Sequence, residues 1–296
     1  MQVSTKLFYD RSATAMGTLT GRADTLQTQI ATGKRLAAPS DDSVAYARLS
    51  GLARVQADAD VTLRNLNVAA GVLAQADSTL TAIGAQLTRA TELAISARSG
   101  TQDATALGAI ADELDQIVAQ LVSLGNATDT RGQPLFGGVD GGVAVTVNAG
   151  GYGFATTLPG AIPTGDGQSI QPGDTAARIF TQAGGNTLAT LEQLSAALRT
   201  GTAVDATAAA TVDKLAVAST QVLGVQVSLG ARAARVELEQ AALKDAGLDR
   251  EALRSGLEDT DVTVAITELQ KTMTILSATQ ASFSKLQSLS LFDYLR

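Results

Sequence analysis

Both ends of this 296-residue chain carry apolar residues that recur every seven positions. Such rows, spaced three and four apart, place apolar side chains along one seam of an α-helix, and a seam of this kind is stable only against another helix. Because both ends have one, we predict that the terminal helices pair and that the chain runs out and folds back along itself. The rows are Tyr9, Met16, Ala23 and Ile30 with Ser12, Leu19 and Leu26, and Val262, Leu269, Leu276 and Phe283 with Ile266 and Met273.

Helical patterns continue inward from both ends. They predict helices over residues 3–31, 41–98, 103–125, about 186–201, about 205–256 and about 259–291. The second of these would be about 85 Å long at ~1.5 Å per residue, an extent that a compact enzyme rarely needs. Aromatic residues make up only 3% of the chain and much of the apolar fraction is alanine, so thin helical layers suit it better than a wide core.

The middle of the chain has a different composition. Four of the five prolines and 14 of the 28 glycines fall between Arg131 and Gly185. Alternation at Val143, Val145 and Val147, followed by paired glycines, is typical of a strand and a turn. We therefore predict a mainly α fold with a small inserted β-rich tip, and a disordered linker is the alternative for the insert. The predicted domains are a terminal coiled coil (1–40 with 257–296), a helical bundle (41–131 with 186–256) and the tip (132–185).

The stretch TGKRLAAPSDD, Thr32–Asp42, interrupts the helical pattern and is predicted to be a joint between two helices. Glycine ends the first helix, proline prevents its continuation, and Ser40 or Asp41 caps the next helix with Asp42 in its first turn. Lysine after glycine resembles a phosphate loop, but the upstream glycine and the hydroxyl residue of that motif are missing. The joint residues are Gly33, Lys34, Arg35, Pro39, Ser40, Asp41 and Asp42.

No residue set indicates catalysis. The chain has no histidine and no cysteine, which excludes the common nucleophilic systems and zinc sites. Adjacent aspartates do not share a helix face, and the Asp-Gly turns lack the spacing of a calcium loop. Carboxylates such as Glu258 and Asp259 are assigned to solvated helix faces. We predict a non-enzyme with no cofactor and no metal.

Charge and hydropathy exclude other classes of partner. The net charge is −7 and no basic stripe is present, which argues against nucleic acid. No apolar run approaches the ~20 residues that span a bilayer, so we expect no membrane insertion. The amino terminus lacks the apolar run of a cleaved signal peptide.

Four stretches carry a resemblance to a known family. They are VSTKLFYDRS (Val3–Ser12), ATGKRLAAPSDDSVAYA (Ala31–Ala47), NATDTRGQPLFGG (Asn126–Gly138) and SLSLFDYLR (Ser288–Arg296). In this order, over both arms, they resemble the bacterial flagellin family of axial proteins, and within it most closely the hook-associated proteins of the hook–filament junction. Residues 139–185 show no such match.

The resemblance implies a structural subunit that assembles helically at the hook–filament junction of an extracellular flagellum. It implies export through the flagellar type III apparatus without a cleaved signal. The implied partners are further copies of the chain, another hook-associated protein on the hook side, flagellin on the filament side and an export chaperone on the C-terminal helix. The predicted assembly residues are Tyr9, Met16, Leu19, Leu26, Ile30, Val262, Ile266, Leu269, Met273, Leu276, Phe283, Leu291, Phe292, Tyr294 and Leu295.

Two alternatives stay open at this point. The chain could be a flagellin that builds the filament itself. The tip could also act as an adhesin that contacts carbohydrate, with Tyr152 and Phe154 as stacking residues, although these rings also suit a very small core.

Overall fold

A computed structural model of the chain describes residues 2–99, 102–137, 142–165 and 167–294, without the side chains of residues 2–6, 8 and 286–294. Residues Met1–Ala57 with Asp245–Arg296 form one compact unit, and Asp58–Lys244 form a second. The elements in chain order are α1 (Gln2–Thr32), α2 (Ser43–Ala97), α3 (Ala104–Gly125), β1 (Val145–Asn148), β2 (Gly151–Phe154), β3 (Ile162–Gly165), β4 (Gln168–Ile170), α4 (Ala176–Phe180), β5 (Thr181–Gln182), β6 (Gly185–Asn186), α5 (Thr187–Thr200), α6 (Val204–Glu258) and α7 (Val262–Tyr294).

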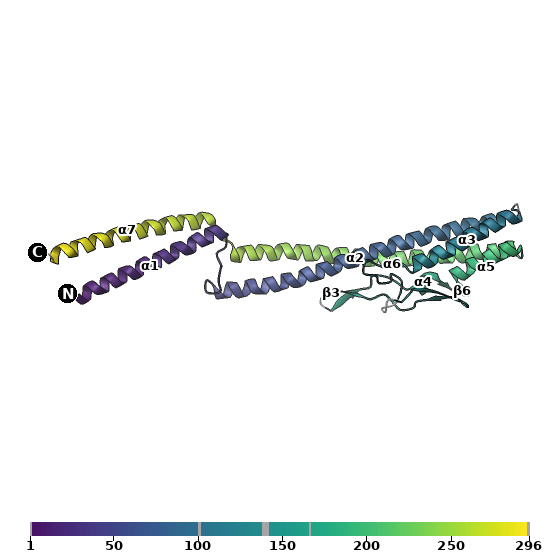
Figure 1. Cartoon of the computed structure of the whole chain (residues 1–296), viewed down its shortest axis with the longest axis horizontal. Coiled ribbons are helices and arrows are strands. Elements are labelled where there is room, and N and C mark those ends of the chain that lie inside the picture. Colours follow the sequence, from purple (N-terminus) through teal and green to yellow (C-terminus); the bar gives the residue numbers. More distant parts are fainter. Residues whose placement is uncertain (1, 100–101, 138–141, 166, 295–296) are drawn as a thin grey trace. The chain divides into compact units, whose positions relative to one another are not determined.

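The mainly helical fold with a small β-rich insert is confirmed (Figure 1). Each predicted helix is present and begins and ends within a few residues of its predicted position. The short helix α4 inside the insert was not predicted. The division of the chain into three domains stays a prediction.

Polar residues define several helix ends. The Asp103 carboxylate accepts a hydrogen bond from the Ala106 amide at 2.8 Å and caps α3. The Asn186 side chain caps α5 in the same way through the Ala189 amide. Gly201 follows α5 with φ of 67°, a left-handed conformation that glycine adopts without steric cost. Local side-chain chemistry thus sets these boundaries.

The second unit is built on long seams along α2 and α6. Their buried residues recur in steps of three and four, as in a coiled coil. The row on α2 is Leu66, Ala69, Leu73, Ala76, Leu80, Ile83, Leu87, Ala90 and Ala94, and Val72, Leu93 and Ala97 are buried beside it. Those of α6 are Ala208, Thr211, Leu215, Ala218, Val222, Val225, Leu229 and Val236.

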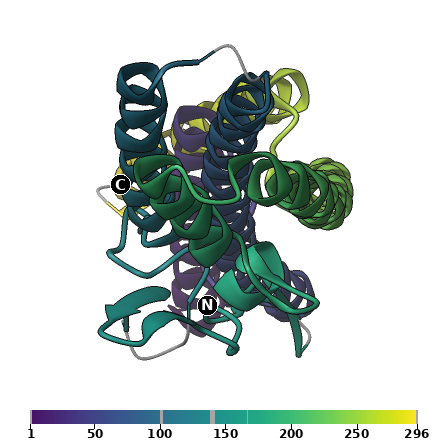
Figure 2. The same ribbon diagram turned by 90° about the vertical axis from the view of Figure 1, so that its right-hand side faces the viewer.

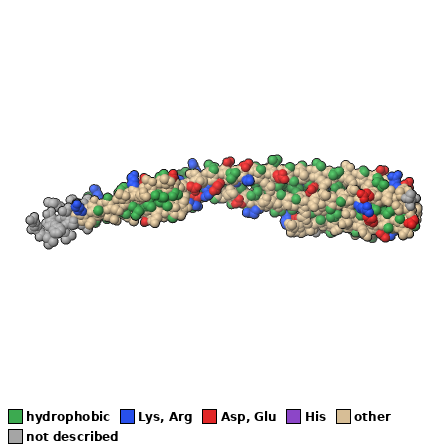
Figure 3. Space-filling view, turned by 90° about the horizontal axis from the view of Figure 1, so that it is seen from above, with side chains coloured by type: hydrophobic (Ala, Val, Ile, Leu, Met, Phe, Trp, Pro, Cys, Tyr) green, Lys and Arg blue, Asp and Glu red, His purple; other side chains and the backbone are tan. Residues whose placement is uncertain are grey.

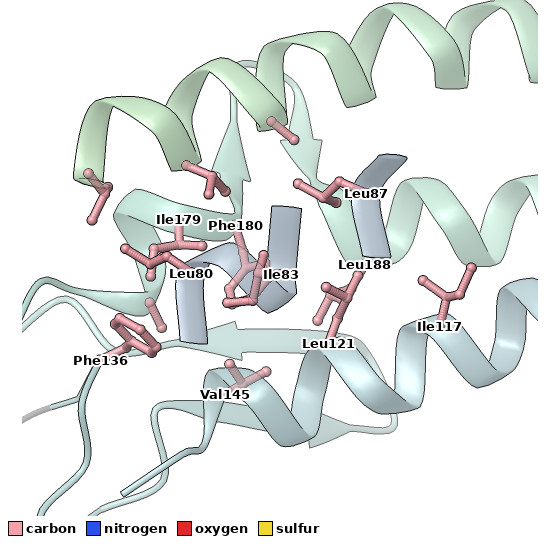
Figure 4. Packing of buried hydrophobic residues seen from close by; sticks show 14 of the residues in the cluster. Leu80, Ile83, Leu87, Ile117, Leu121, Phe136, Val145, Ile179, Phe180 and Leu188 are labelled. Carbon is pink, nitrogen blue, oxygen red and sulfur yellow. The ribbon is translucent and has the colours of Figure 1, made fainter. Parts of the chain in front are cut away.

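Helices α3 and α5 complete the core of this unit. They pack on each other, and each buries a row of aliphatic side chains, Ile110, Leu114, Ile117 and Leu121 on α3 and Leu188, Leu191, Leu194 and Leu198 on α5. Figure 2 looks along the helices and shows the bundle end-on. Figure 4 shows Leu80, Ile83 and Leu87 of α2 in one core with Leu121 of α3 and Leu188 of α5. The bundle is therefore a close-packed layer of helices with small and aliphatic side chains.

The described part of the insert folds as three antiparallel hairpins, β1–β2, β3–β4 and β5–β6, with α4 between the second and third. Phe154 stacks on Phe180, with ring centroids 5.7 Å apart. The predicted alternation is only partly right, because β1 begins at Val145. Val145 is buried, whereas Val143 and Val147 are exposed. The alternative of a disordered linker does not hold for the described residues.

A polar network fastens the insert to α6. The Arg232 guanidinium donates to the carbonyls of Gln171 at 3.1 Å and Gly173 at 2.6 Å. It also lies 3.7 Å from the buried Asp174 carboxylate, which pairs with Arg178 at 2.6 Å. A Cβ at Gly173 would lie 2.2 Å from the Leu135 carbonyl oxygen, so only glycine allows this close approach of two backbone segments.

We expect Arg232→Met to loosen the insert while the helices stay folded. The substitution leaves two carbonyls without their donor, while the Asp174 carboxylate keeps Arg178, and this costs about 1–3 kcal/mol of folding free energy. Limited proteolysis should then cut within residues 155–175 at rates well above those of the parent, with unchanged helical circular dichroism. Arg250→Met, which removes a guanidinium bonded to Gln56 elsewhere on α6, is the matched control. Equal protease resistance of the Arg232 variant and the parent would contradict the anchoring role.

Candidate functional site: the terminal helix pair and its joint

The α1 side of the terminal seam is as predicted. One row of half-buried side chains runs along α1 in steps of three and four, and the residues between are exposed apart from Gln29. The row is Tyr9, Ser12, Met16, Leu19, Ala23, Leu26 and Ile30. This burial pattern confirms the heptad interpretation of the amino-terminal helix.

Helix α7 runs antiparallel to α1. The rings of Tyr9 and Phe283 meet edge to face with centroids 5.4 Å apart, and Arg22 pairs with Glu268 at 2.9 Å. Beyond these contacts, the amide of Thr260, just before α7, donates to the carbonyl of Gly33, the residue after α1, at 2.9 Å. The terminal helices therefore pair along their length, which confirms the out-and-back course of the chain.

Of the two rows of apolar residues predicted for the seam of α7, the second does not face α1. Leu269, Leu276 and Phe283 are half-buried as predicted, but the second row is Ala265, Thr272 and Thr279. Val262, Ile266 and Met273, by contrast, are 42%, 41% and 55% exposed. Both rows fit a three–four spacing beside the same leucines, and the smaller side chains allow the closer approach of the two helices.

As a result, α7 keeps an exposed apolar flank made of Val262, Ile266 and Met273. Val264 and Ile275, also exposed, lie toward the other side of the helix. Figure 3 shows hydrophobic side chains gathered on the surface of the terminal helix pair. Among the predicted assembly residues, the side chains of Leu291, Phe292 and Tyr294 and the whole of Leu295 lie outside what the structure describes.

The predicted joint is brought together with the connection between α6 and α7. Gly33 ends α1 with φ of 70°, a conformation that favours glycine. Lys34 and Asp259 then form an antiparallel bridge, in which the Arg35 amide donates to the Glu258 carbonyl at 2.6 Å. The two chain connections are thus hydrogen-bonded to each other.

Charges reinforce this bridge. The Lys34 ammonium pairs with the Glu258 carboxylate, which also accepts from Arg254 at 2.6 Å. The Arg35 guanidinium donates to the Leu257 carbonyl at 2.9 Å, one of the free carbonyls at the end of α6. The hydrogen bond from Lys34 holds the pKa of Glu258 below its ordinary value, and Arg254 adds to the effect. This cluster of Lys34, Arg35, Arg254 and Glu258 is called the clasp below.

The start of α2 differs from the prediction in its capping residue. The Asp42 carboxylate accepts from the amides of Val44 at 3.1 Å and Ala45 at 3.0 Å, so Asp42 is the cap and the helix begins at Ser43. Asp41 instead accepts from the amides of Ala38 and Ala37, and these bonds lower its pKa. The predicted cap at Ser40 or Asp41 is therefore wrong, because the loop uses Asp41 to close its own turn. Pro39 and Ser40 are exposed in that turn.

Sequence reasoning missed Arg254 and misassigned Glu258, whose side chain is only 13% exposed in the clasp. Its partner Lys34 lies 224 residues away along the chain. A signal was nonetheless present, since an Arg-x-x-x-Glu pair occupies the last turn of a helix that must meet the basic joint. Pairing of the two ends would have brought these charges together.

The remaining features of the described residues give no catalytic arrangement. They contain no group of three or more His, Cys, Asp or Glu that could hold a metal ion. A cavity of about 170 Å³ lies beside Val72, Pro134 and Pro159, but the Asp129 carboxylate at its edge is bonded to Arg131 and the Gln133 amide. None of the described helices is long and apolar enough to cross a membrane.

The aromatic residues of the tip are engaged internally. Tyr152 donates to the Glu192 carboxylate, and burial together with this partner raises the pKa of its phenol. Phe154 is half-buried on Phe180. These contacts favour the interpretation of both rings as core residues over one as carbohydrate platforms.

Comparisons with known proteins agree with this architecture. The bacterial flagellin N-terminal helical region matches residues 3–140, and the bacterial flagellin C-terminal helical region matches residues 212–295. Flagellar hook-associated protein 3 of Salmonella typhimurium is 26% identical over an aligned length of 316 residues, which covers 99% of both chains.

Solved structures show the same fold. A flagellar hook-associated protein from Vibrio parahaemolyticus superposes with a TM-score of 0.70 at 19% identity, covering 74% of this chain and 100% of the other. The flagellar junction protein FlgL from Legionella pneumophila gives 0.59 at 14% identity, covering 72% of this chain and 100% of the other. The two matched helical regions span most of the chain and coincide with the paired arms, and the chain belongs to the bacterial flagellin family.

Proposed function

We propose that this protein is a structural subunit of the bacterial flagellum that acts by assembly, not catalysis, at the junction between hook and filament. The observation that carries the proposal is the terminal helix pair. In this pair α1 covers one face of α7, and the apolar flank of α7 stays exposed. Family membership supports it, as do the names of the relatives, a hook-associated protein matched over nearly its whole length and a junction protein of the same fold.

The exposed flank supplies the contact between subunits. Each large apolar side chain moved from water into an interface contributes roughly 1.5–3 kcal/mol. Val262, Ile266 and Met273 stand on one side of the seam that α1 covers, so a neighbouring subunit reaches them without displacing α1. Repeated head-to-tail contacts of this kind build a ring or a helical tube.

The proposed position at the hook–filament junction determines which proteins the subunit contacts. Further copies of the chain lie alongside, another hook-associated protein lies on the hook side, and flagellin lies on the filament side. The subunit leaves the cell through the flagellar type III apparatus, with a chaperone on α7 before export. A chain without cysteine forms no disulfide that would hinder passage in an unfolded state.

The clasp fixes the direction in which the terminal pair leaves the joint. The backbone bridge between Lys34 and Asp259 and the ion pairs around Glu258 tie both connections at one point. A subunit that must match its neighbours needs this angle held alike in every copy.

We expect a double substitution on the flank, Ile266→Glu with Met273→Glu, to prevent incorporation into flagella. The added charges oppose burial at the interface, whereas both positions are solvent-exposed in the isolated chain, so its thermal unfolding should change little. The measurement is swarming and negative-stain microscopy of a strain that lacks its own junction protein and expresses the variant. Gln270→Glu, on an exposed polar position of α7, is the control.

Microscopy of the same strain expressing the unsubstituted chain distinguishes a junction protein from a flagellin that forms the filament. Hooks that gain a filament only when flagellin is also present support a junction role. Long filaments formed without flagellin, or normal swarming of the double variant, would contradict the proposal.

We expect Glu258→Gln to loosen the clasp at neutral pH by about 1–2 kcal/mol, because two charge-assisted hydrogen bonds are lost. Hydrogen exchange of the Arg35 and Thr260 amides should accelerate, since both close the bridge. Glu237→Gln, on an exposed face of α6, should leave these amides unchanged.

Acid should have the same effect on the unsubstituted chain. A carboxylate whose pKa is lowered in the folded state stabilises the fold above its ordinary pKa. That contribution is lost as the pH falls through the lowered value, so accelerated exchange should begin only below the ordinary pKa of glutamate. Equal exchange in parent and variant at neutral pH, where the parent carboxylate is charged, would rule out a role for Glu258.

A further inference from the structure

Helix α7 carries two alternative rows that complete a seam with α1. In the structure α1 covers three large residues of α7, called the shared positions below, which are Leu269, Leu276 and Phe283. It also covers the small side chains beside them, called the small row below, which are Ala265, Thr272 and Thr279. The flank lies on the other side of the shared positions. Either row alternates with the shared positions in steps of three and four, so each completes a coiled-coil seam with them.

The row that α1 covers is the less apolar of the two. Thr272 is 3% exposed, whereas Ile266 is 41% exposed and Met273 55%. Burial of apolar surface favours the opposite choice, because isoleucine and methionine remove more apolar area from water than alanine and threonine do. The observed packing gains instead from the close approach of the two helices, which small side chains allow. Apolar burial and close approach therefore favour different rotations of the same helix.

The register of the pair places both rows at the same level of α1. Three contacts define this antiparallel register, Tyr9 with Phe283, Arg22 with Glu268, and Gly33 with Thr260. Counting along the helices from these contacts places Leu19 level with Thr272 and Met273. Exchange of the rows thus needs no sliding of the helices. Neighbouring residues of a helix stand about 100° apart, and the two seams share the large residues, so a rotation of α7 by about 50° around its own axis is sufficient.

The contacts at the edges of the seam permit this rotation. The ion pair between Arg22 and Glu268 is exposed to solvent, and such pairs contribute little to stability. Phe283 belongs to both seams, so its contact with Tyr9 does not select one of them. Thr260 and Asp261 connect α7 to the backbone bridge of the joint, and a few residues at the end of an element are enough to absorb a rotation.

We infer that α7 has two packing positions against α1, related by this rotation. The open position is the one in the structure, with the flank exposed (Figure 3). In the closed position α1 of the same chain covers the flank, and the small row faces solvent. The ion pair between Arg22 and Glu268 opens at the same time, because Glu268 lies on the side of the small row and moves away with it.

This inference rests on the proposed function and adds a control step to it. The closed position withholds the flank from a neighbouring subunit, and the open position offers it. A partner that binds the flank selects the open position, and it shifts the equilibrium by as much as its affinities for the two positions differ. The free chain meanwhile has a way to cover Ile266 and Met273, whose exposure favours aggregation.

Cysteine pairs report the two positions directly, because the chain has no thiol of its own. Leu19→Cys with Thr272→Cys reports the open position, and Leu19→Cys with Met273→Cys reports the closed one. A disulfide forms only when the two sulfurs approach closely. Both pairs should therefore give an intramolecular disulfide when the dilute purified chain is oxidised. Leu19→Cys with Lys271→Cys is the control and should react many-fold more slowly, since residue 271 stands about 100° from residue 272 and about 160° from residue 273.

Two further substitutions should shift the balance in opposite directions. Thr272→Leu enlarges the small row and opposes close approach, so it should raise the rate at which the Leu19→Cys and Met273→Cys pair forms its disulfide several-fold. Ile266→Ser removes apolar burial that only the closed position provides and should lower this rate several-fold. Position 266 is exposed in the open position, so this variant keeps its fold, which circular dichroism checks.

Binding to isolated hooks from a strain that lacks its own junction protein tests the control step. The chain locked by the Leu19→Cys and Met273→Cys disulfide should bind only after reduction, and its reduced form is the control. The chain locked through Thr272→Cys should bind without reduction.

The outcomes separate this inference from the proposed function. A Met273→Cys pair that reacts no faster than the Lys271→Cys pair would overturn the closed position and leave the junction role standing. Equal binding of the oxidised and reduced Met273→Cys pair would overturn the control step. Failure of the unsubstituted chain to bind hooks, with both disulfides formed in solution, would overturn the junction role and the control step while supporting the rotation itself.

Discussion

The pairing of narrow helix seams is the interaction on which the rest of the structure depends. Each long helix buries one row of small and aliphatic side chains, and none of these rows gains anything until a helix from the other half of the chain lies against it. In the first unit the row on α1 meets α7, and in the second unit the rows on α2 and α6 face a common core. Stability is thus non-local throughout, and neither arm has a core of its own.

The places where the seams end use a different chemistry. At the joint, backbone hydrogen bonds and the clasp replace apolar burial, because the chain there must leave two helices and enter two others. At the insert, Arg232 occupies a position of the α6 seam where an apolar side chain would otherwise pack. Its guanidinium donates hydrogen bonds to two carbonyls of the insert instead. At both places a carboxylate that is largely shielded from solvent meets a cation that stays partly exposed, so each contact constrains the position of the segment that carries it. Both polar sites therefore specify where attached parts sit.

These two chemistries explain how far the sequence could be interpreted. Heptad spacing locates the helices and the α1 row, because spacing is a local property of the chain. It could not choose between Ile266 with Met273 and Thr272 with Thr279, since both rows flank the same leucines and only the partner helix decides. The clasp was missed for a related reason, as Glu258 looks solvated until the pairing of the two ends places Lys34 beside it. Asp41 and Asp42 are equally good caps in isolation, and the turn at Pro39 decides between them.

A protein that works alone would cover its apolar faces, and this one leaves several exposed. The flank of α7 carries large apolar side chains in solvent, as do Leu223, Val227 and Leu238 on α6, and for a monomer this is a risk of aggregation. The net charge of −7 is spread along the chain and opposes random association, whereas residues 215–231 of α6 carry no charge. Burial of these faces in the proposed assembly would remove that risk.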